Sequence, residues 1–191
     1  TSGDYNVAIG YEAGEETTSG DSNTWVGGLA GASCTTASNN VGIGRNALLT
    51  NTTGSDNAAV GRGALDANTT GDNNIAIGRN ALGANTTANN NTAVGYQALV
   101  DNTTGTQNVA MGVNALGLNT TANNNTAVGY FALLANTTGT RNVAIGANAL
   151  DASSTGNYNV AVGTHCLSAN TTASNNTAVG DYCMEVSTTG T

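Results

Sequence analysis

The chain has 191 residues, of which only 8% are charged and 4% are aromatic, and its formal net charge is −8. Such an acidic chain is poorly suited to bind DNA, RNA or an anionic membrane surface, and no apolar stretch approaches the roughly 18 residues that a membrane-spanning helix needs. The scarcity of large apolar residues argues against an ordinary globular core, whereas a solenoid needs only a narrow stack of small aliphatic side chains.

A unit of 17 residues recurs along the chain without insertion or deletion. The segment NNTAVGYQALVDNTTG at 90–105 returns as NNTAVGYFALLANTTG at 124–139, two units later. Numbering each unit from its leading Asn gives the consensus N-(V/T)-A-(V/I)-G-x-x-A-L-x-x-N-T-T-(G/A)-x-x. The leading residues are Asn6, Asn23, Asn40, Asn57, Asn74, Asn91, Asn108, Asn125, Asn142, Asn159 and Asn176. We expect a single repeat domain over 1–191, cut from a longer fibre because neither end carries a capping unit.

The unit length and composition predict an all-β, parallel β-solenoid with eleven coils. Seventeen residues are too few for the helix pair of a helical repeat, and Asn, Thr and Gly dominate over strong helix formers. Short Val-, Ile- and Thr-containing strands interrupted by Gly and Asn turns fit one coil per unit. Stacked strands lie about 4.8 Å apart, so eleven coils predict a rod on the order of 50 Å long.

Recurring residues predict ladders that run from coil to coil. Asn at position 1 suits a stacked amide ladder, and Gly at position 5 suits a turn with positive φ. Val, Ile or Met at position 4, Ala at position 8 and Leu at position 9 are expected to form the core. The structural ladders are represented by Asn74, Asn91 and Asn108, by Gly78, Gly95 and Gly112, and by Leu82, Leu99 and Leu116.

Arginines occupy position 6 in three consecutive units, Arg45, Arg62 and Arg79. One hypothesis is a groove for an acidic glycan. The favoured interpretation is a solvated row relieved by Asp56, Asp66 and Asp72, because rows of charge are usually solvated faces. His165, the single histidine, stands at position 7, and we expect it on the surface. No nucleophile, base and acid recur together and no Cys or His spacing fits zinc, so no catalysis, cofactor or metal is expected.

Positions 12 and 14 predict a candidate surface lattice of Asn and Thr, because alternate residues of a strand share a face. Its members are Asn85 and Thr87, Asn102 and Thr104, and Asn119 and Thr121. A regular Thr lattice is typical of ice-binding solenoids, although adjacent Thr residues are better explained by strand propensity. The same Asn-Thr-Thr units, at Asn51, Asn68 and Asn102, are also N-glycosylation sequons, which matter only in a host that glycosylates secreted proteins.

Three local features complete the pattern. Position 15 is Gly or Ala, and position 17 is Asn wherever position 15 is Ala, which predicts that the left-handed turn residue moves from position 15 to position 17. Cys166 and Cys183 both replace Ala at position 8, and we expect small buried residues rather than a disulfide. Trp25 replaces Ala at position 3, and three glycines compensate for its size. They are Gly42 in the same row, and Gly14 and Gly31 at position 9.

Both faces of the predicted strand are apolar, which suggests association of chains. Positions 2 and 4 should point one way and position 3 the other, and position 3 is mostly Ala, as at Ala76, Ala93 and Ala110. A lone solenoid should have one wet face. We therefore expect one face to line the core and the other, with its small Ala residues, to pack against neighbouring copies, most simply in a homotrimer.

The strand units resemble the head repeats of trimeric autotransporter adhesins. The matching units are NVAIG at 6–10, NIAIG at 74–78, NVAIG at 142–146 and NVAVG at 159–163. The phrase NTAVGYQAL at 91–99, followed by NTTG, is similar to repeats in bacteriophage tail-fibre shafts and bacterial surface fibres. This resemblance implies a parallel β-roll wound into a trimer, although the adhesin coils are shorter.

The sequence thus predicts a structural and adhesive fibre shaft segment, extracellular, on a cell surface or on a virion. Its expected partner is itself, with a receptor or glycan bound through flanking regions, and neither nucleic-acid binding nor membrane insertion is expected. Two alternatives stay open. One is an ice-binding solenoid that uses the Asn/Thr lattice, and the other is a glycan-binding surface with Tyr96, Tyr130 and Phe131 as stacking groups.

Overall fold

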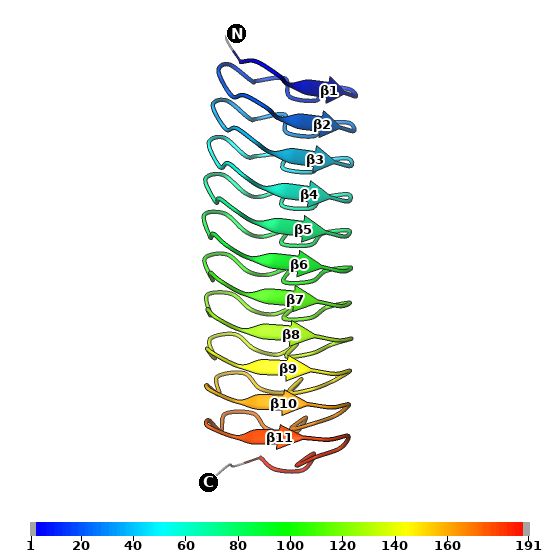
Figure 1. Ribbon diagram of the computed structural model, residues 1–191, viewed down its shortest axis with the longest axis vertical. Helices are drawn as coiled ribbons and strands as arrows, with labels where there is room; N and C mark the ends of the chain where they lie inside the picture. Colours follow the sequence, from blue (N-terminus) through cyan, green and yellow to red (C-terminus); the bar gives the residue numbers. More distant parts are fainter. Residues whose placement is uncertain (1–2, 189–191) are drawn as a thin grey trace.

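The computed structural model describes residues 3–188 and forms a parallel β-solenoid (Figure 1). One sheet holds eleven three-residue strands in chain order, and every neighbouring pair is parallel. The strands are β1 Val7–Ile9, β2 Thr24–Val26, β3 Val41–Ile43, β4 Ala58–Val60, β5 Ile75–Ile77, β6 Thr92–Val94, β7 Val109–Met111, β8 Thr126–Val128, β9 Val143–Ile145, β10 Val160–Val162 and β11 Thr177–Val179. The predicted fold class and coil length are confirmed; the ends of the predicted domain, 1–2 and 189–191, lie outside the described residues.

Backbone hydrogen bonds join neighbouring coils around the whole circuit, not only at the strands. At position 9, the Leu99 amide donates to the Ala115 carbonyl of the next coil at 3.0 Å. At position 13, the Thr103 amide donates to the Thr120 carbonyl at 2.9 Å, and the Thr103 hydroxyl donates to the same oxygen at 3.1 Å. A buried backbone needs such partners. This explains why Thr is so frequent at position 13, because its hydroxyl adds a second bond between coils.

Each coil turns by means of left-handed residues at positions 7, 9 and 17. Position 17 has positive φ in units with Gly at position 15, as at Asn73 (57°), and in units with Ala there, as at Asn90 (61°). The expected migration of the left-handed residue from position 15 to position 17 is therefore wrong, because no residue at position 15 within 3–188 has positive φ in either kind of unit. The glycines at position 15 nevertheless lie close to main chain of the next coil. A Cβ on Gly105 would lie 2.3 Å from the Ala122 carbonyl oxygen of the next coil.

Leucine at position 9 occupies a backbone region that L-residues usually avoid. Leu99 has φ 55° and a fully buried side chain. The left-handed conformation costs about 1–2 kcal/mol, whereas burial of a Leu side chain contributes roughly 1.5–3 kcal/mol. Burial therefore offsets the strain at this position, and the backbone twist directs the Leu row into the core.

The core is a narrow stack of small side chains. In the middle coils the rows at positions 3, 8 and 9 are fully buried, as at Ala93, Ala98 and Leu99, whereas Ala8 and Met184 in the terminal coils are exposed. The expectation that position 4 belongs to the core is wrong, because its side chains lie half-buried or exposed, with Met111 at 42% exposure. Position 3 therefore faces inward, beside the rows at positions 8 and 9.

Two asparagine ladders run inside the rod. In the expected ladder at position 1, the Asn91 backbone amide and Nδ2 both donate to Asn74 Oδ1, at 3.0 and 3.4 Å. In a second ladder at position 12, Asn102 Nδ2 donates to Asn85 Oδ1 at 3.1 Å. Both ladders also donate to the position 15 carbonyl, because Asn91 Nδ2 and Asn102 Nδ2 each lie 2.9 Å from Gly105 O. The buried Nδ2 groups of both ladders are therefore paired, as burial requires, whereas Asn136 Oδ1, which is followed at position 12 by Ser153, has no partner.

The second ladder overturns the predicted surface lattice. Asn85, Asn102 and Asn119 at position 12 are fully buried, whereas Thr87, Thr104 and Thr121 at position 14 are exposed. The two rows do not share a face, because positions 12–17 form a turn rather than a strand and strand alternation does not apply there. The sequon asparagines Asn51, Asn68 and Asn102 belong to the same internal row and are inaccessible in the folded rod.

Trp25 fills the space that three glycines leave, as expected. Its side chain is 1% exposed. A Cβ would lie 2.6 Å from the indole at Gly14, 2.4 Å at Gly31 and 2.7 Å at Gly42. Positions 3 and 9 therefore share one internal space. The cysteines at position 8 are free thiols, with Cys166 buried and Cys183 half-buried.

Trp25→Ala should leave a cavity and destabilise the first three coils by about 3–5 kcal/mol. The measurement is amide hydrogen exchange of β1 to β3. The triple variant Trp25→Ala, Gly31→Leu and Gly42→Ala restores the consensus residues in the second and third units and should recover most of the lost protection. If Trp25→Ala alone leaves exchange in these strands unchanged, the indole does not support the core.

Candidate functional site

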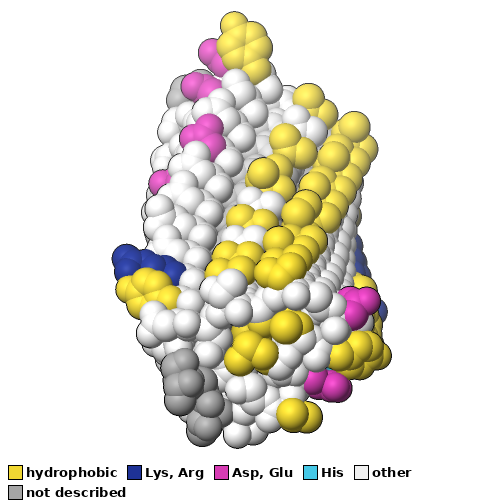
Figure 2. All heavy atoms as spheres, turned by 60° about the horizontal axis from the view of Figure 1, so that its bottom comes forward, with side chains coloured by type: hydrophobic (Ala, Val, Ile, Leu, Met, Phe, Trp, Pro, Cys, Tyr) yellow, Lys and Arg dark blue, Asp and Glu magenta, His cyan; other side chains and the backbone are white. Residues whose placement is uncertain are grey.

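The strands present an apolar surface to solvent, which we call the outer sheet face. It consists of the side chains at positions 2 and 4 of β1 to β11, which lie opposite the buried Ala row. Ile75 and Ile77 of β5 are 41% and 42% exposed, and Ile145 of β9 is 41% exposed. Figure 2 shows hydrophobic side chains gathered in rows that run along one face of the rod. No charged residue stands at either position in any of the eleven strands.

The pairing of the strands makes this surface regular. Each strand pairs in register with the next, so that Thr92 lies beside Val109 and Val94 lies beside Met111. Side chains of like position therefore repeat every ~4.8 Å along the rod. Position 4 gives an unbroken row of Ile, Val and Met, whereas position 2 mixes Val and Ile with Thr and one Ala. The result is a narrow, straight strip of apolar side chains as long as the sheet.

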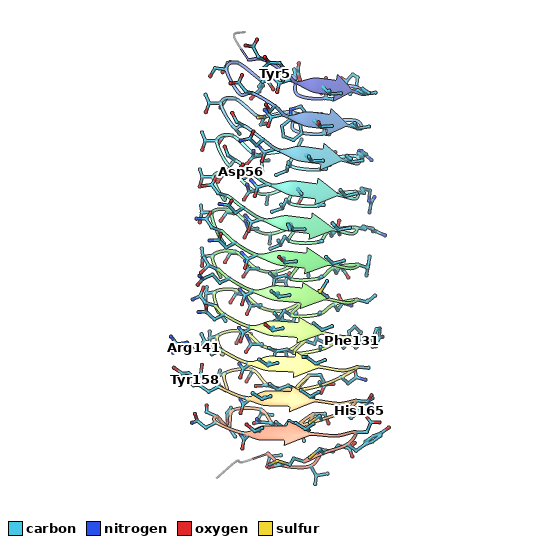
Figure 3. The ribbon with its side chains drawn as sticks, viewed as in Figure 1. Tyr5, Asp56, Phe131, Arg141, Tyr158 and His165 are labelled. Atoms are coloured by element: carbon cyan, nitrogen blue, oxygen red, sulfur yellow. The ribbon has the colours of Figure 1, made fainter. Side chains whose placement is uncertain are left out.

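Two edges of the rod carry the aromatic and charged side chains. Figure 3 places Arg141 and Tyr158 on the opposite edge from Phe131 and His165. On the first edge, the Arg141 guanidinium lies 5.3 Å from the ring centre of Tyr158 and hydrogen-bonds its hydroxyl group. On the second edge, His165 stacks on Tyr182 with centroids 5.2 Å apart. Tyr130 and Phe131, two of the predicted stacking groups, have centroids 4.0 Å apart.

The arginine column at position 6 has only one of its expected acidic neighbours beside it. Asp66 lines a hollow together with Arg45 and Arg62. Asp56 lies on the edge that carries Arg141 (Figure 3), and Asp72 Oδ1 accepts a hydrogen bond from the Ser55 amide at 2.7 Å in the turn at position 16. The expectation that all three carboxylates relieve the column is therefore wrong for Asp56 and Asp72. Arg79, the third member, lies 5.6 Å from the ring centre of Tyr96.

The Asp66 side chain is half-buried. Desolvation raises the pKa of Asp66 above its ordinary value, and hydrogen bonds from its own amide and that of Ala67 lower it in part. The side chain is therefore a hydrogen-bond acceptor in a partly dehydrated place. Within residues 3–188, no group of three or more His, Cys, Asp or Glu is arranged to hold a metal ion, and the same part of the chain contains no helix that could cross a membrane.

Sequence reasoning found both apolar faces of the strand but exchanged their roles. Position 3, expected at a chain interface, lies in the core, and positions 2 and 4 are exposed. The sequence did contain a sign of this. Glycines at position 9, a core row, make room for Trp25 at position 3, which indicates that position 3 points inward. No protein-family model, curated protein or solved structure matches the chain.

Proposed function

We propose that this chain is a non-catalytic structural segment of an extracellular fibre, on a cell surface or a virion, in which three copies pack through their outer sheet faces. The observation that carries the proposal is the uncharged apolar strip along all eleven strands. Contiguous apolar surface of this kind marks an association site in soluble proteins, and removal of the strip from water would favour assembly.

The partner that fits this strip best is another copy of the same chain. Side chains on the strip repeat every ~4.8 Å, and only a partner with the same axial repeat can keep its side chains in phase along the full length. A second copy has that repeat in each of its coils. The absence of charge on the strip also removes the like-charge repulsion that two copies of an acidic chain would otherwise suffer.

Three chains are proposed because rotational symmetry closes the assembly. Three rods can turn their strips toward one axis, which buries every strip and leaves the charged and aromatic edges outside. The NVAIG-type units at 6–10 and 142–146, whose likeness is to trimeric adhesin heads, support the same number. The ice-binding alternative is not proposed, since the Asn half of its lattice is buried.

Sedimentation equilibrium tests the assembly. The wild-type chain should sediment with three times its 18.8 kDa mass. The double variant Val94→Asp and Val128→Asp places two carboxylates on the outer sheet face and should sediment as a folded monomer, because each charge would be buried without a partner. The matched control Thr104→Asp adds a charge at exposed position 14 and should remain a trimer.

A wild-type mass of one or two chains would contradict the trimer. A monomer that also shapes growing ice crystals would instead identify the outer sheet face as an ice-binding surface. If Thr104→Asp dissociates the assembly as strongly as the double variant, the outer sheet face is not the contact between chains.

A further inference from the structure

One interruption in the column at position 7 opens a hollow at the edge of the rod. Asn46 and Asn80 occupy this position on either side of Gly63, and all three are left-handed, with φ of 61°, 55° and 66°. Gly63 is the one glycine in the column. The missing side chain leaves a hollow of about 250 Å³ that is lined by Arg45, Asn46, Arg62, Gly63, Asp66 and Asn80. Ligand pockets begin at roughly 300 Å³, so this hollow suits one small ring.

The lining combines cationic donors with oxygen acceptors. Arg45 and Arg62 stand at the same position of consecutive coils, about 4.8 Å apart along the rod, and both side chains are exposed. Asn80 Oδ1 is one acceptor of the hollow, since it would lie 2.8 Å from a Cβ on Gly63. The half-buried Asp66 carboxylate is a second acceptor in the same hollow. Two guanidinium groups therefore lie beside two hydrogen-bond acceptors.

This set of groups discriminates among ligands. A bare anion such as sulfate would pair with the arginines but would face the Asp66 carboxylate and the Asn80 carbonyl, neither of which can donate. A neutral sugar would donate to both acceptors but would leave the arginines without an anion. A sugar that carries both a carboxylate and hydroxyl groups supplies each missing partner.

We propose that the hollow around Gly63 binds a carboxylated monosaccharide unit of the uronic acid type. The sugar carboxylate pairs with the guanidinium groups of Arg45 and Arg62, and its hydroxyl groups donate to Asp66 and to Asn80 Oδ1. The location supports this assignment, because three of the four arginines of an acidic chain lie in consecutive coils here. The site belongs to one chain and does not depend on the proposed trimer.

Isothermal titration of the wild-type protein with sodium glucuronate tests the site, with glucose, acetate and sulfate as comparison ligands. Glucuronate should bind at least roughly tenfold more tightly than each of the others, which corresponds to about 1.4 kcal/mol. Arg62→Gln should weaken glucuronate binding by about the same factor. Gly63→Asn should abolish it, because the side chain restores the column and fills the hollow at a backbone angle that Asn46 and Asn80 already adopt.

The control is Arg141→Gln, which removes an arginine from the opposite edge and should leave glucuronate binding unchanged. Circular dichroism establishes that each variant is folded. The proposal is overturned if the wild type does not bind glucuronate, if sulfate binds as tightly, if Arg141→Gln weakens binding as much as Arg62→Gln, or if folded Gly63→Asn binds like the wild type. None of these outcomes changes the mass of the assembly, so a failure of the proposed sugar site can be distinguished from a failure of the proposed trimer.

Discussion

A variant that lacks one whole coil, residues 91–107, should remain a folded rod, whereas a variant that lacks only residues 91–99 should lose the continuous rod. The first deletion joins position 17 of one coil to position 1 of the next, so each side chain still stacks on the residue at the same position of the neighbouring coil. The second leaves eight residues of a coil, 100–107, which cannot complete a circuit. Core rows on either side would then face turn residues, because a break in register moves buried side chains to the wrong face.

Circular dichroism and thermal unfolding measure the difference. The 91–107 deletion should keep the wild-type signal per residue, and the 91–99 deletion should lower both the signal and the unfolding temperature. A deletion of residues 99–115 is the matched control, because it also removes seventeen residues but starts in the middle of a coil and joins Ala98 to Leu116. If 99–115 behaves like 91–99, the identity of the unit matters rather than the number of residues.

Gly95→Ala should destabilise its coil far more than Gly180→Ala, although both glycines have similar backbone angles, with φ of 138° and 128°. A Cβ on Gly95 would lie 2.4 Å from the Gly112 carbonyl oxygen of the next coil, whereas the nearest atom to a Cβ on Gly180 is Cys183 Cβ at 3.8 Å. Gly180→Ala should therefore cost only the backbone strain, about 1–3 kcal/mol. Gly95→Ala adds overpacking against main chain, for roughly 2–6 kcal/mol in all.

Hydrogen exchange at the mutated coil, measured against the wild type, separates the two contributions. Faster exchange in β6 and β7 of Gly95→Ala, with a smaller change in β11 of Gly180→Ala, is the expected pattern. Equal losses of protection would mean that φ alone demands glycine at position 5 and that close approach of neighbouring coils adds nothing.

The periodicity predicted the architecture because each ladder depends on identical spacing. Asn at position 1 and Leu at position 9 recur at fixed offsets, and both form the internal rows expected of them. The space shared by Trp25, Gly31 and Gly42 was predictable for the same reason, since a large side chain in a uniform row requires a reduction elsewhere.

The direction of each row was harder to predict than its existence. Strand alternation separates Ala93 from Thr92 and Val94 but does not say which set points inward when both are apolar. Asn102 looked like a surface residue because Asn is usually exposed, yet the turn carbonyl of Gly105 needs its donor inside the rod. Leu99 adopts a left-handed backbone against its own propensity because burial outweighs strain. In all three cases tertiary packing, rather than local sequence preference, determined how the residue is placed.

The stacking of the coils also determines how the rod would respond to force. Each strand contacts only the strands before and after it, and the hydrogen bonds between coils run along the rod axis. A force along that axis on a single chain would be borne by one interface between coils at a time, and the terminal coil would detach first. In three chains held together along their outer sheet faces, the three terminal coils would have to detach together. Lateral association would therefore make the rod more resistant to force.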